Sequence, residues 1–135
     1  MIPGENDEPD ETKRLCEWIV NHLGDAVPVH FTAFHPDFKL TDKPRTPATT
    51  LTRARQIAKS SGIKFAYVGN VYDDEGQTTY CPACSRALIR RSWHEILENN
   101  LRGDRCPCGE PIPGFLAPDR APELRRRRGL RSLQQ

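Results

Sequence analysis

The amino-acid sequence predicts an α/β fold that is followed by a small cysteine-rich module. In the first half of the chain, two stretches with helical periodicity alternate with two strand-like stretches. Strands that are separated by helices usually pair in parallel through crossover connections. In the second half, four of the five cysteines form two tight clusters. We expect the α/β part at residues 1–72, the module at residues 73–116 and a disordered arginine-rich tail at residues 117–135.

The composition is that of a polar chain of modest size. Hydrophobic residues make up 36% of the 135 positions, and 12 prolines and 9 glycines indicate many loops. A chain of this length forms one domain, or a small domain with an appendage. The formal net charge of +2 gives no overall electrostatic reason to bind nucleic acid. We therefore disfavour a nucleic-acid partner, and we interpret the arginine run in the tail as a solvated segment.

The first helix is expected from Pro9 to Leu23. Proline suits the first helical turn because its missing N–H would have no partner there. Gly24 is expected to end the helix. Cys16 is interpreted as a small core residue of this helix and not as a metal ligand. The apolar face is predicted from helical spacing and comprises Leu15, Trp18, Ile19, His22 and Leu23.

Two strands are expected, at residues 27–34 and 63–71. The first shows clear alternation, with Phe31 on one face and His30 on the other. We interpret His30 as a core histidine whose ring is satisfied by hydrogen bonds. The second strand ends at Gly69 and Asn70, which are typical of a strand exit.

A second helix is expected between these strands. It begins near Thr46, with Pro47 in its first turn, and it ends at Gly62. Residues 72–78 are predicted to be a loop. Two parallel strands cannot form a stable sheet alone, because a parallel sheet needs more strands and cover on both faces. Since residue 1 already resembles the end of a strand, we expect the chain to be the C-terminal part of a longer architecture or to dock on a partner.

The cysteine clusters predict a metal site. Cys81 and Cys84 form a C-P-x-C pair, and Cys106 and Cys108 form a C-P-C pair. Two short turns that each present two thiolates are typical of a zinc ribbon, in which four sulfurs bind one Zn²⁺ ion tetrahedrally. The second pair is one residue shorter than the usual turn, so whether it completes the site is open. His94 is a possible substitute ligand.

Other uses of these cysteines are disfavoured but stay open. Free or disulfide-linked thiols are one alternative, and a redox C-x-x-C motif is another. A redox motif works at a helix N-terminus that follows a strand, whereas Pro82 and the basic residues after it indicate a turn that enters a hairpin. We expect this hairpin to have its own small core, formed by Leu88, Ile89, Trp93, Ile96 and Leu101.

The sequence also predicts the cellular compartment of the protein. No apolar run is long enough to cross a bilayer, and no signal peptide precedes residue 20. We therefore expect a cytoplasmic protein without a membrane partner. A reducing compartment favours metal-bound cysteines over disulfides.

Several segments also resemble a known family. They are I-P-G-E-N-D at the start, F-H-P-D-F-K-L after the first strand, Y-V-G-N-V in the second strand, and T-Y-C-P-A-C with C-G-E-P-I-P-G at the cysteines. Over residues 1 to about 116 they resemble the C-terminal part of a radical S-adenosylmethionine (SAM) enzyme of the AmmeMemoRadiSam system. That group is similar to pyruvate formate-lyase activating enzyme.

The resemblance implies the last βα units of a partial (β/α) barrel, followed by a zinc-ribbon-like tail. Enzymes of this kind bind a [4Fe-4S] cluster through a C-x-x-x-C-x-x-C motif and cleave SAM to a 5′-deoxyadenosyl radical. That motif and the glycine-rich SAM-binding strand are both absent from this sequence. The implied function is therefore a part of a radical SAM oxidoreductase that is inactive alone. Its implied partner is the missing N-terminal half of the barrel or a partner subunit. Whether the chain is a truncated gene product or one half of a split enzyme stays open.

Two residues are assigned to SAM by the same resemblance. His35 matches a histidine that lies near SAM in the activating enzymes, and its place after a strand is where barrel active sites gather. Asn70 follows the next strand, and the same argument assigns it to the SAM site. The alternative for His35 is a loop histidine that caps backbone groups. The resemblance gives no substrate.

Two other functions are considered. The alternative to a radical SAM part is a non-catalytic zinc-ribbon module that binds a protein or nucleic acid partner. A hydrolytic metalloenzyme is disfavoured, because four thiolates leave no open coordination position for a water molecule.

Overall fold

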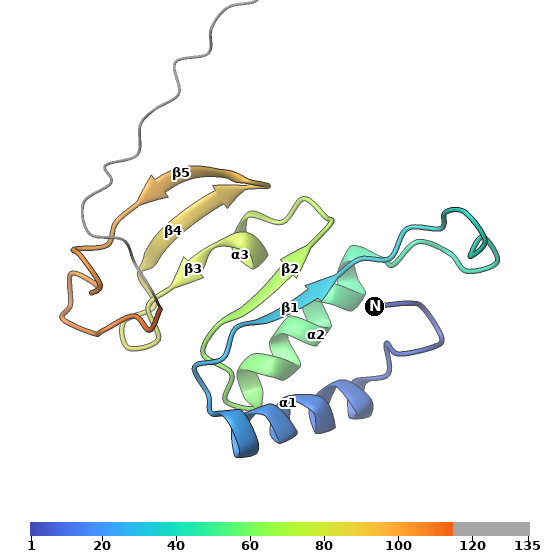
Figure 1. The fold of residues 1–135 in the computed structure, drawn as a ribbon, viewed down its shortest axis with the longest axis horizontal. Coiled ribbons are helices and arrows are strands. Elements are labelled where there is room, and N and C mark those ends of the chain that lie inside the picture. Colours follow the sequence, from blue (N-terminus) through green and yellow to red (C-terminus); the bar gives the residue numbers. More distant parts are fainter. Residues whose placement is uncertain (115–135) are drawn as a thin grey trace, which may run out of the picture.

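The computed structural model describes residues 1–114, so the disordered tail expected at residues 117–135 lies outside the described residues. The expected helices, strands and hairpin are present, and one further short helix joins them. The elements are α1 (Pro9–Leu23), β1 (Val29–Thr32), α2 (Ala48–Ser60), β2 (Ala66–Gly69), α3 (Asp74–Gln77), β3 (Thr79–Tyr80), β4 (Ala87–Ser92) and β5 (Glu95–Asn99). The result is a mixed α/β fold with two small sheets (Figure 1).

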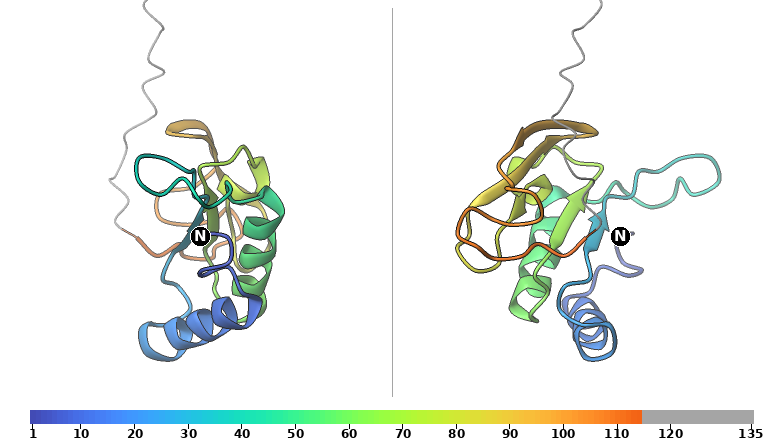
Figure 2. Two further views of the ribbon diagram at one scale, coloured as in Figure 1. Left: turned by 90° about the vertical axis from the view of Figure 1, so that its right-hand side faces the viewer. Right: turned by 60° about the vertical axis from the view of Figure 1, so that its left-hand side comes forward.

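The first sheet is a parallel pair, as the alternation of helices and strands predicts. β1 and β2 run in register from Val29 opposite Ala66 to Thr32 opposite Gly69, with α2 as the crossover between them. Both expected strands are therefore real but shorter than their sequence patterns. α2 lies along one face of this pair, and α1 packs against α2 beside β1 (Figures 1 and 2).

The main hydrophobic core lies between this face and the two helices. Phe31 and Val68 point from the strands into it, and Leu51 of α2 is completely buried. Cys16 of α1 is also completely buried, which confirms that it is a core residue. Burial of this apolar surface provides the main free energy that holds the helices on the sheet.

The apolar face predicted for α1 is wrong in part. Helix α1 buries Thr12 and Cys16, and Ile19 and Val20 are partly buried beside them. The core-facing stripe is thus rotated from the expected one, because the small Cys16 lets α1 approach α2 closely. The expected core residues that are exposed instead are Leu15, Trp18, His22 and Leu23.

The segment predicted as a loop at residues 72–78 contains the short helix α3. The Asp73 carboxylate accepts a hydrogen bond of 2.8 Å from the Gly76 backbone N–H, which caps the first turn. Gly76 is buried, and a Cβ atom there would lie 2.3 Å from a methyl carbon of Val68. α3 therefore packs directly on β2, and a glycine is needed for that approach.

The second sheet is antiparallel and has the order β3-β4-β5. It contains the predicted hairpin, and its core is centred on Leu88, which is completely buried. Ile89 and Leu101 pack against this core. Trp93 and Ile96, predicted to belong to it, are 58% and 52% exposed, because Trp93 lies at the turn of the hairpin and all residues of β5 are exposed.

The other face of the β1–β2 pair is not covered by helices. His30 lies on this face and is exposed, so its interpretation as a core histidine is wrong. Thr32 is exposed as well, and Tyr67 of β2 is partly exposed. The Met1 amino group donates a hydrogen bond of 2.6 Å to the Thr32 carbonyl oxygen, so the first residue lies at the end of β1 (Figure 1).

Among residues 1–114, the structure has no helix that is both long enough and apolar enough to cross a membrane.

The buried Arg55 of α2 connects three elements. Its Nε atom donates to the Ala66 carbonyl oxygen at 3.0 Å, and its Nη1 atom donates to the Glu75 carboxylate at 2.8 Å. The Glu75 side chain is 70% exposed, whereas that of Arg55 is 7% exposed. Hydrogen bonding to Arg55, and then its charge, lower the pKa of Glu75.

We predict that Arg55→Met destabilises the fold more than Glu75→Gln. The first change leaves the Ala66 carbonyl without its donor, at a cost of about 1–3 kcal/mol. The second removes an exposed charge partner, at a cost of about 0–1 kcal/mol. Because the pKa of Glu75 is lowered on folding, its contribution is complete above the ordinary glutamate value of 4.5 and is lost as the pH falls through the folded-state value. Urea unfolding across acidic pH would measure both effects, and equal losses in the two variants at neutral pH would contradict the prediction.

Candidate metal centre

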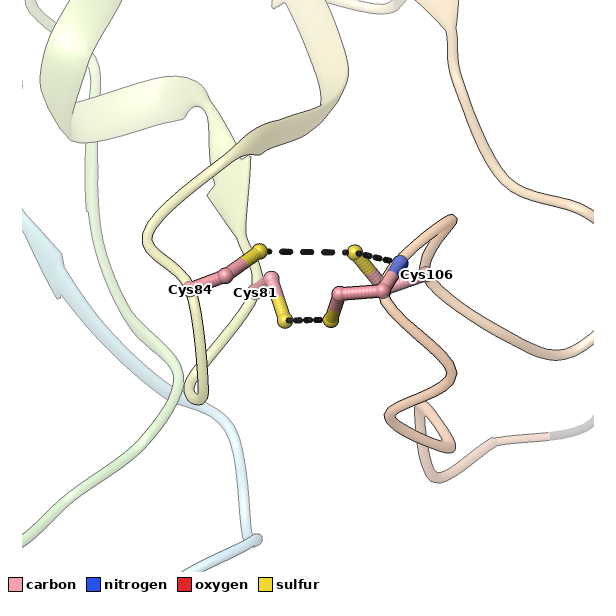
Figure 3. Close-up of side chains that lie close together, drawn as sticks. Cys81, Cys84 and Cys106 are labelled. Carbon is pink, nitrogen blue, oxygen red and sulfur yellow. Dashed lines mark hydrogen bonds between the residues drawn. The ribbon is translucent and has the colours of Figure 1, made fainter.

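Four cysteine side chains meet between two loops of the second sheet. Cys81 and Cys84 lie in the turn between β3 and β4, and Cys106 and Cys108 lie in the loop that follows β5. All four Sγ atoms lie within 4.8 Å of one another. The structure therefore brings together the complete set of residues that the sequence predicts (Figure 3).

The two turns have the same construction despite their different lengths. In the first, the Ser85 N–H donates to the Cys81 carbonyl, and the Cys81 N–H donates to the Arg86 carbonyl. In the second, the Gly109 N–H donates to the Cys106 carbonyl, and the Cys106 N–H donates to the Glu110 carbonyl. The same pair of bonds closes both turns. In these bonds Cys106 takes the place of Cys81, Gly109 that of Ser85, and Glu110 that of Arg86.

This equivalence explains how the shorter C-P-C pair completes the site. The second turn omits one residue between its cysteines, yet it still returns its second sulfur toward the first pair. A left-handed residue follows the second cysteine in both turns, with φ of 59° at Ser85 and 98° at Gly109. Serine takes this conformation at an energetic cost that glycine does not have.

The distances between sulfurs fit one tetrahedral ion. Cys81 Sγ lies 3.7 Å from Cys108 Sγ, and Cys84 Sγ lies 3.6 Å from Cys106 Sγ. Four Zn–S bonds of about 2.3 Å in a tetrahedron separate the sulfurs by about 3.8 Å. A disulfide would need an S–S distance of about 2.05 Å. The described geometry is therefore that of a site able to bind a metal ion such as zinc, and all four thiols are free.

The electrostatics also favour a cation. Cys81 and Cys106 are each only 2% exposed, while Cys84 and Cys108 are exposed. Burial is the main cause that raises the pKa of the Cys106 thiol to about 12, although the Cys108 backbone N–H, 3.5 Å from the sulfur, acts in the opposite direction. Such a thiol becomes a thiolate at neutral pH only when a nearby positive charge compensates its own.

His94 is not part of this cluster. It lies in the turn between β4 and β5 and is exposed. The group of metal-ligating side chains in residues 1–114 consists of the four cysteines. A substitute histidine ligand is therefore not needed.

His35 and Asn70 lie at the same edge of the first sheet, because they follow two strands that pair in parallel. The Asn70 side-chain amide donates a hydrogen bond of 3.4 Å to the Ala33 carbonyl, two residues before His35. Asn70 has a φ of 58°, and both side chains are exposed. Their assignment to SAM stays a prediction.

A cavity that the sequence does not predict lies between the open face of the first sheet and the turn of the hairpin. Its polar lining comes from β1, β2, α3 and the β4–β5 hairpin, so no short motif marks it. The alternation in the two strands was the one available signal, since it places His30 and Tyr67 on the same face.

The fold and the site together define a mixed α/β protein with a four-cysteine cluster that can bind a metal ion. The uncharacterized protein MJ0808 of Methanocaldococcus jannaschii is 42% identical to this chain over 115 residues. The match covers 83% of this chain and 34% of that protein, so the chain spans about a third of the length of this relative. No family model matches the chain. No solved structure matches it either.

We predict that Ser85→Gly stabilises the metal-bound protein by up to about 1 kcal/mol, because glycine adopts a positive φ without steric cost. Gly109→Ala should destabilise it by about 1 kcal/mol or slightly more, because alanine adopts the positive φ of this position only at a steric cost. No atom of residues 1–114 lies within 4 Å of a Cβ built at Gly109, so this loss would come from the backbone conformation. Urea unfolding at saturating metal gives the values.

Ala83→Gly in the first turn is the matched control. Ala83 does not have a positive φ, so glycine there should bring no gain. A loss of stability in Ser85→Gly equal to that in Ala83→Gly would contradict the steric cost that is assigned to the positive φ of Ser85.

Proposed function

We propose that this chain is the C-terminal part of a radical SAM enzyme of the activating-enzyme type, and that its four cysteines hold a structural zinc ion. The observation that carries the first half of the proposal is the incomplete parallel sheet. Parallel sheets are normally covered on both faces and have more than two strands. Here one face of β1–β2 carries α2, against which α1 packs, and the other exposes His30 and Thr32.

Two further observations support this proposal. α1 exposes Leu15 and Trp18 by 49% and 51%, which suits a helix with a neighbour on each side. The relative from Methanocaldococcus jannaschii is about three times as long as the part that this chain matches. Both are consistent with additional βα units beside β1, and the sequence segments that resemble radical SAM enzymes agree with this arrangement.

The short distances between sulfurs favour a single zinc ion over an iron–sulfur cluster. In a four-iron cluster each cysteine binds a different iron, so the sulfurs lie farther apart than the ligands of one ion. The separations of 3.6 and 3.7 Å match the edges expected for a tetrahedron of sulfurs around one zinc ion. With four thiolates the coordination of zinc is complete, so the ion would stabilise the fold and would not activate water.

The catalytic cluster of the family does not fit this chain. It needs the C-x-x-x-C-x-x-C motif, which the 135 residues do not contain, and four of the five cysteines form the four-thiolate site. Radical formation would therefore belong to the missing half of the barrel or to a partner subunit. His35 and Asn70 would contribute contacts to SAM from the carboxyl edge of the sheet, where barrel active sites lie.

The alternative is a non-catalytic zinc-ribbon module that binds a protein or nucleic acid partner. The observation that favours it is that β3, β4 and β5 have a sheet and a core of their own. The two functions are distinguished by the sequence that lies upstream of Met1 in the genome, or in an adjacent gene. A C-x-x-x-C-x-x-C segment there would support the radical SAM enzyme.

We predict that the reduced protein binds about one zinc ion per chain. Cys81→Ser or Cys108→Ser should abolish tight binding, whereas Cys16→Ala should leave it unchanged, because Cys16 is buried in α1. Since each ligand must lose a proton, affinity should fall as the pH falls. Metal analysis after gel filtration measures the stoichiometry.

Removal of the metal should unfold the module at residues 79–114 before the first sheet, because zinc binding there contributes directly to folding. Hydrogen exchange would show lost protection in β4 and retained protection in α2. Full zinc retention in both serine variants would contradict the assignment of the ligands.

We predict that the chain alone, reconstituted with iron, sulfide and reductant, forms no 5′-deoxyadenosine from SAM. When a front half with the missing motif is supplied, the product should appear. His35→Ala should then weaken SAM binding without loss of the cluster spectrum, and His22→Ala, on the exposed face of α1, serves as the control. Product formation by the chain alone, or unchanged SAM affinity in His35→Ala, would each refute one part of the proposal.

A further inference from the structure

A cavity of about 560 Å³ lies between the open face of β1–β2 and the turn of the β4–β5 hairpin. Its volume is within the range of small-molecule sites. Figure 1 shows the turn of the hairpin on the side where α3 and β2 lie. The side chains that matter for its chemistry are His30, Tyr67, Gln77, Arg91, Trp93 and His94.

Three aromatic rings provide flat surfaces in this cavity. The rings of His30 and Tyr67 stack at a centroid distance of 4.9 Å. The Tyr67 hydroxyl is held by the Thr79 hydroxyl at 3.0 Å, which fixes the ring between the two sheets. Trp93 is 58% exposed and has a φ of 53°, an unfavourable conformation for a large residue. Its backbone N–H donates to the Gln77 side chain, which holds the turn in place.

The charge around the cavity is of one sign. Arg91 is half-buried, and its Nη1 atom donates to the Thr79 hydroxyl at 2.9 Å and weakly to the Gln77 carbonyl. Among the described residues, no aspartate or glutamate lines the cavity. Within residues 1–114 Arg91 also forms no ion pair, whereas its neighbour Arg90 pairs with Glu98 at 3.0 Å. A half-buried guanidinium without a carboxylate partner is a ready site for an anion.

We infer that this cavity binds a small anionic ligand that carries a flat ring. The carboxylate or phosphate group would accept hydrogen bonds from the guanidinium of Arg91, with His30 of β1 and His94 of the hairpin turn also lining the cavity. The ring would lie against the aromatic surfaces of Tyr67 and Trp93. None of the four metal-site cysteines lines the cavity, so this inference does not depend on the proposed zinc site. Asn70, which the proposed radical SAM function assigns to SAM, lines the cavity as well, but the anion site is argued from Arg91 and the aromatic rings.

The full 135-residue chain provides its own fluorescent reporter. It has two tryptophans, so Trp18→Phe leaves Trp93 as the single one, at the edge of the cavity. In this background phenyl phosphate and benzoate should each change the fluorescence of Trp93 to saturation. The ligand with the higher affinity identifies the preferred anion. Benzyl alcohol has the same ring without the charge and should bind at least about tenfold more weakly, because a hydrogen bond to a charged group contributes about 1.5–3 kcal/mol.

Arg91→Gln and Arg90→Gln form a matched pair of variants on β4. Arg91→Gln should weaken binding of the preferred anion by about tenfold or more, and Arg90→Gln should leave it within about twofold. If Arg91→Gln loosens the hairpin through its lost bonds to Thr79 and Gln77, Arg91→Lys keeps the positive charge and should restore part of the affinity. If neither phenyl phosphate nor benzoate binds saturably, the inference is overturned. Equal binding of benzyl alcohol, or equal effects of the Arg90 and Arg91 variants, would overturn it too.

Discussion

The short parallel ladder between β1 and β2 is the constraint on which the rest of the structure depends. Its register places Phe31 and Val68 on the face that α2 covers, and places His30 and Tyr67 on the opposite face. Because both strands run in the same direction, their exits lie at one edge, and this edge carries the two predicted SAM-binding residues. A shift of one residue in the register would exchange the two faces.

The cysteine module is attached to this ladder through specific contacts. Phe65, next to β2, is buried in the core of the module together with Cys81 and Cys106. The Tyr67 hydroxyl and the Arg91 guanidinium meet at the Thr79 hydroxyl, which joins the two sheets. The order of the module therefore affects the shape of the cavity as well as the metal centre. A metal ion at the four sulfurs would offset the cost of burying their charges and would fix both surfaces together.

The open face and the exposed stripe of α1 are consistent with one explanation. Polar and aromatic side chains on an uncovered sheet face are expected where a larger barrel encloses a binding site, and an apolar stripe on the outside of a helix is expected where another helix packs. The cavity next to Arg91 would then lie on the interior side of such a barrel.

The sequence by itself determined the order of the elements, the buried Cys16 and the identity of the four clustered cysteines, because local periodicity and spacing encode these features. It did not determine the buried face of α1, since the approach of α1 to α2 depends on small residues in both helices. Nor did it reveal α3, a single turn held by Asp73 and Gly76 against β2. The closure of the C-P-C turn and the cavity around Arg91 were decided only in three dimensions, because their parts come from elements that are distant in the sequence.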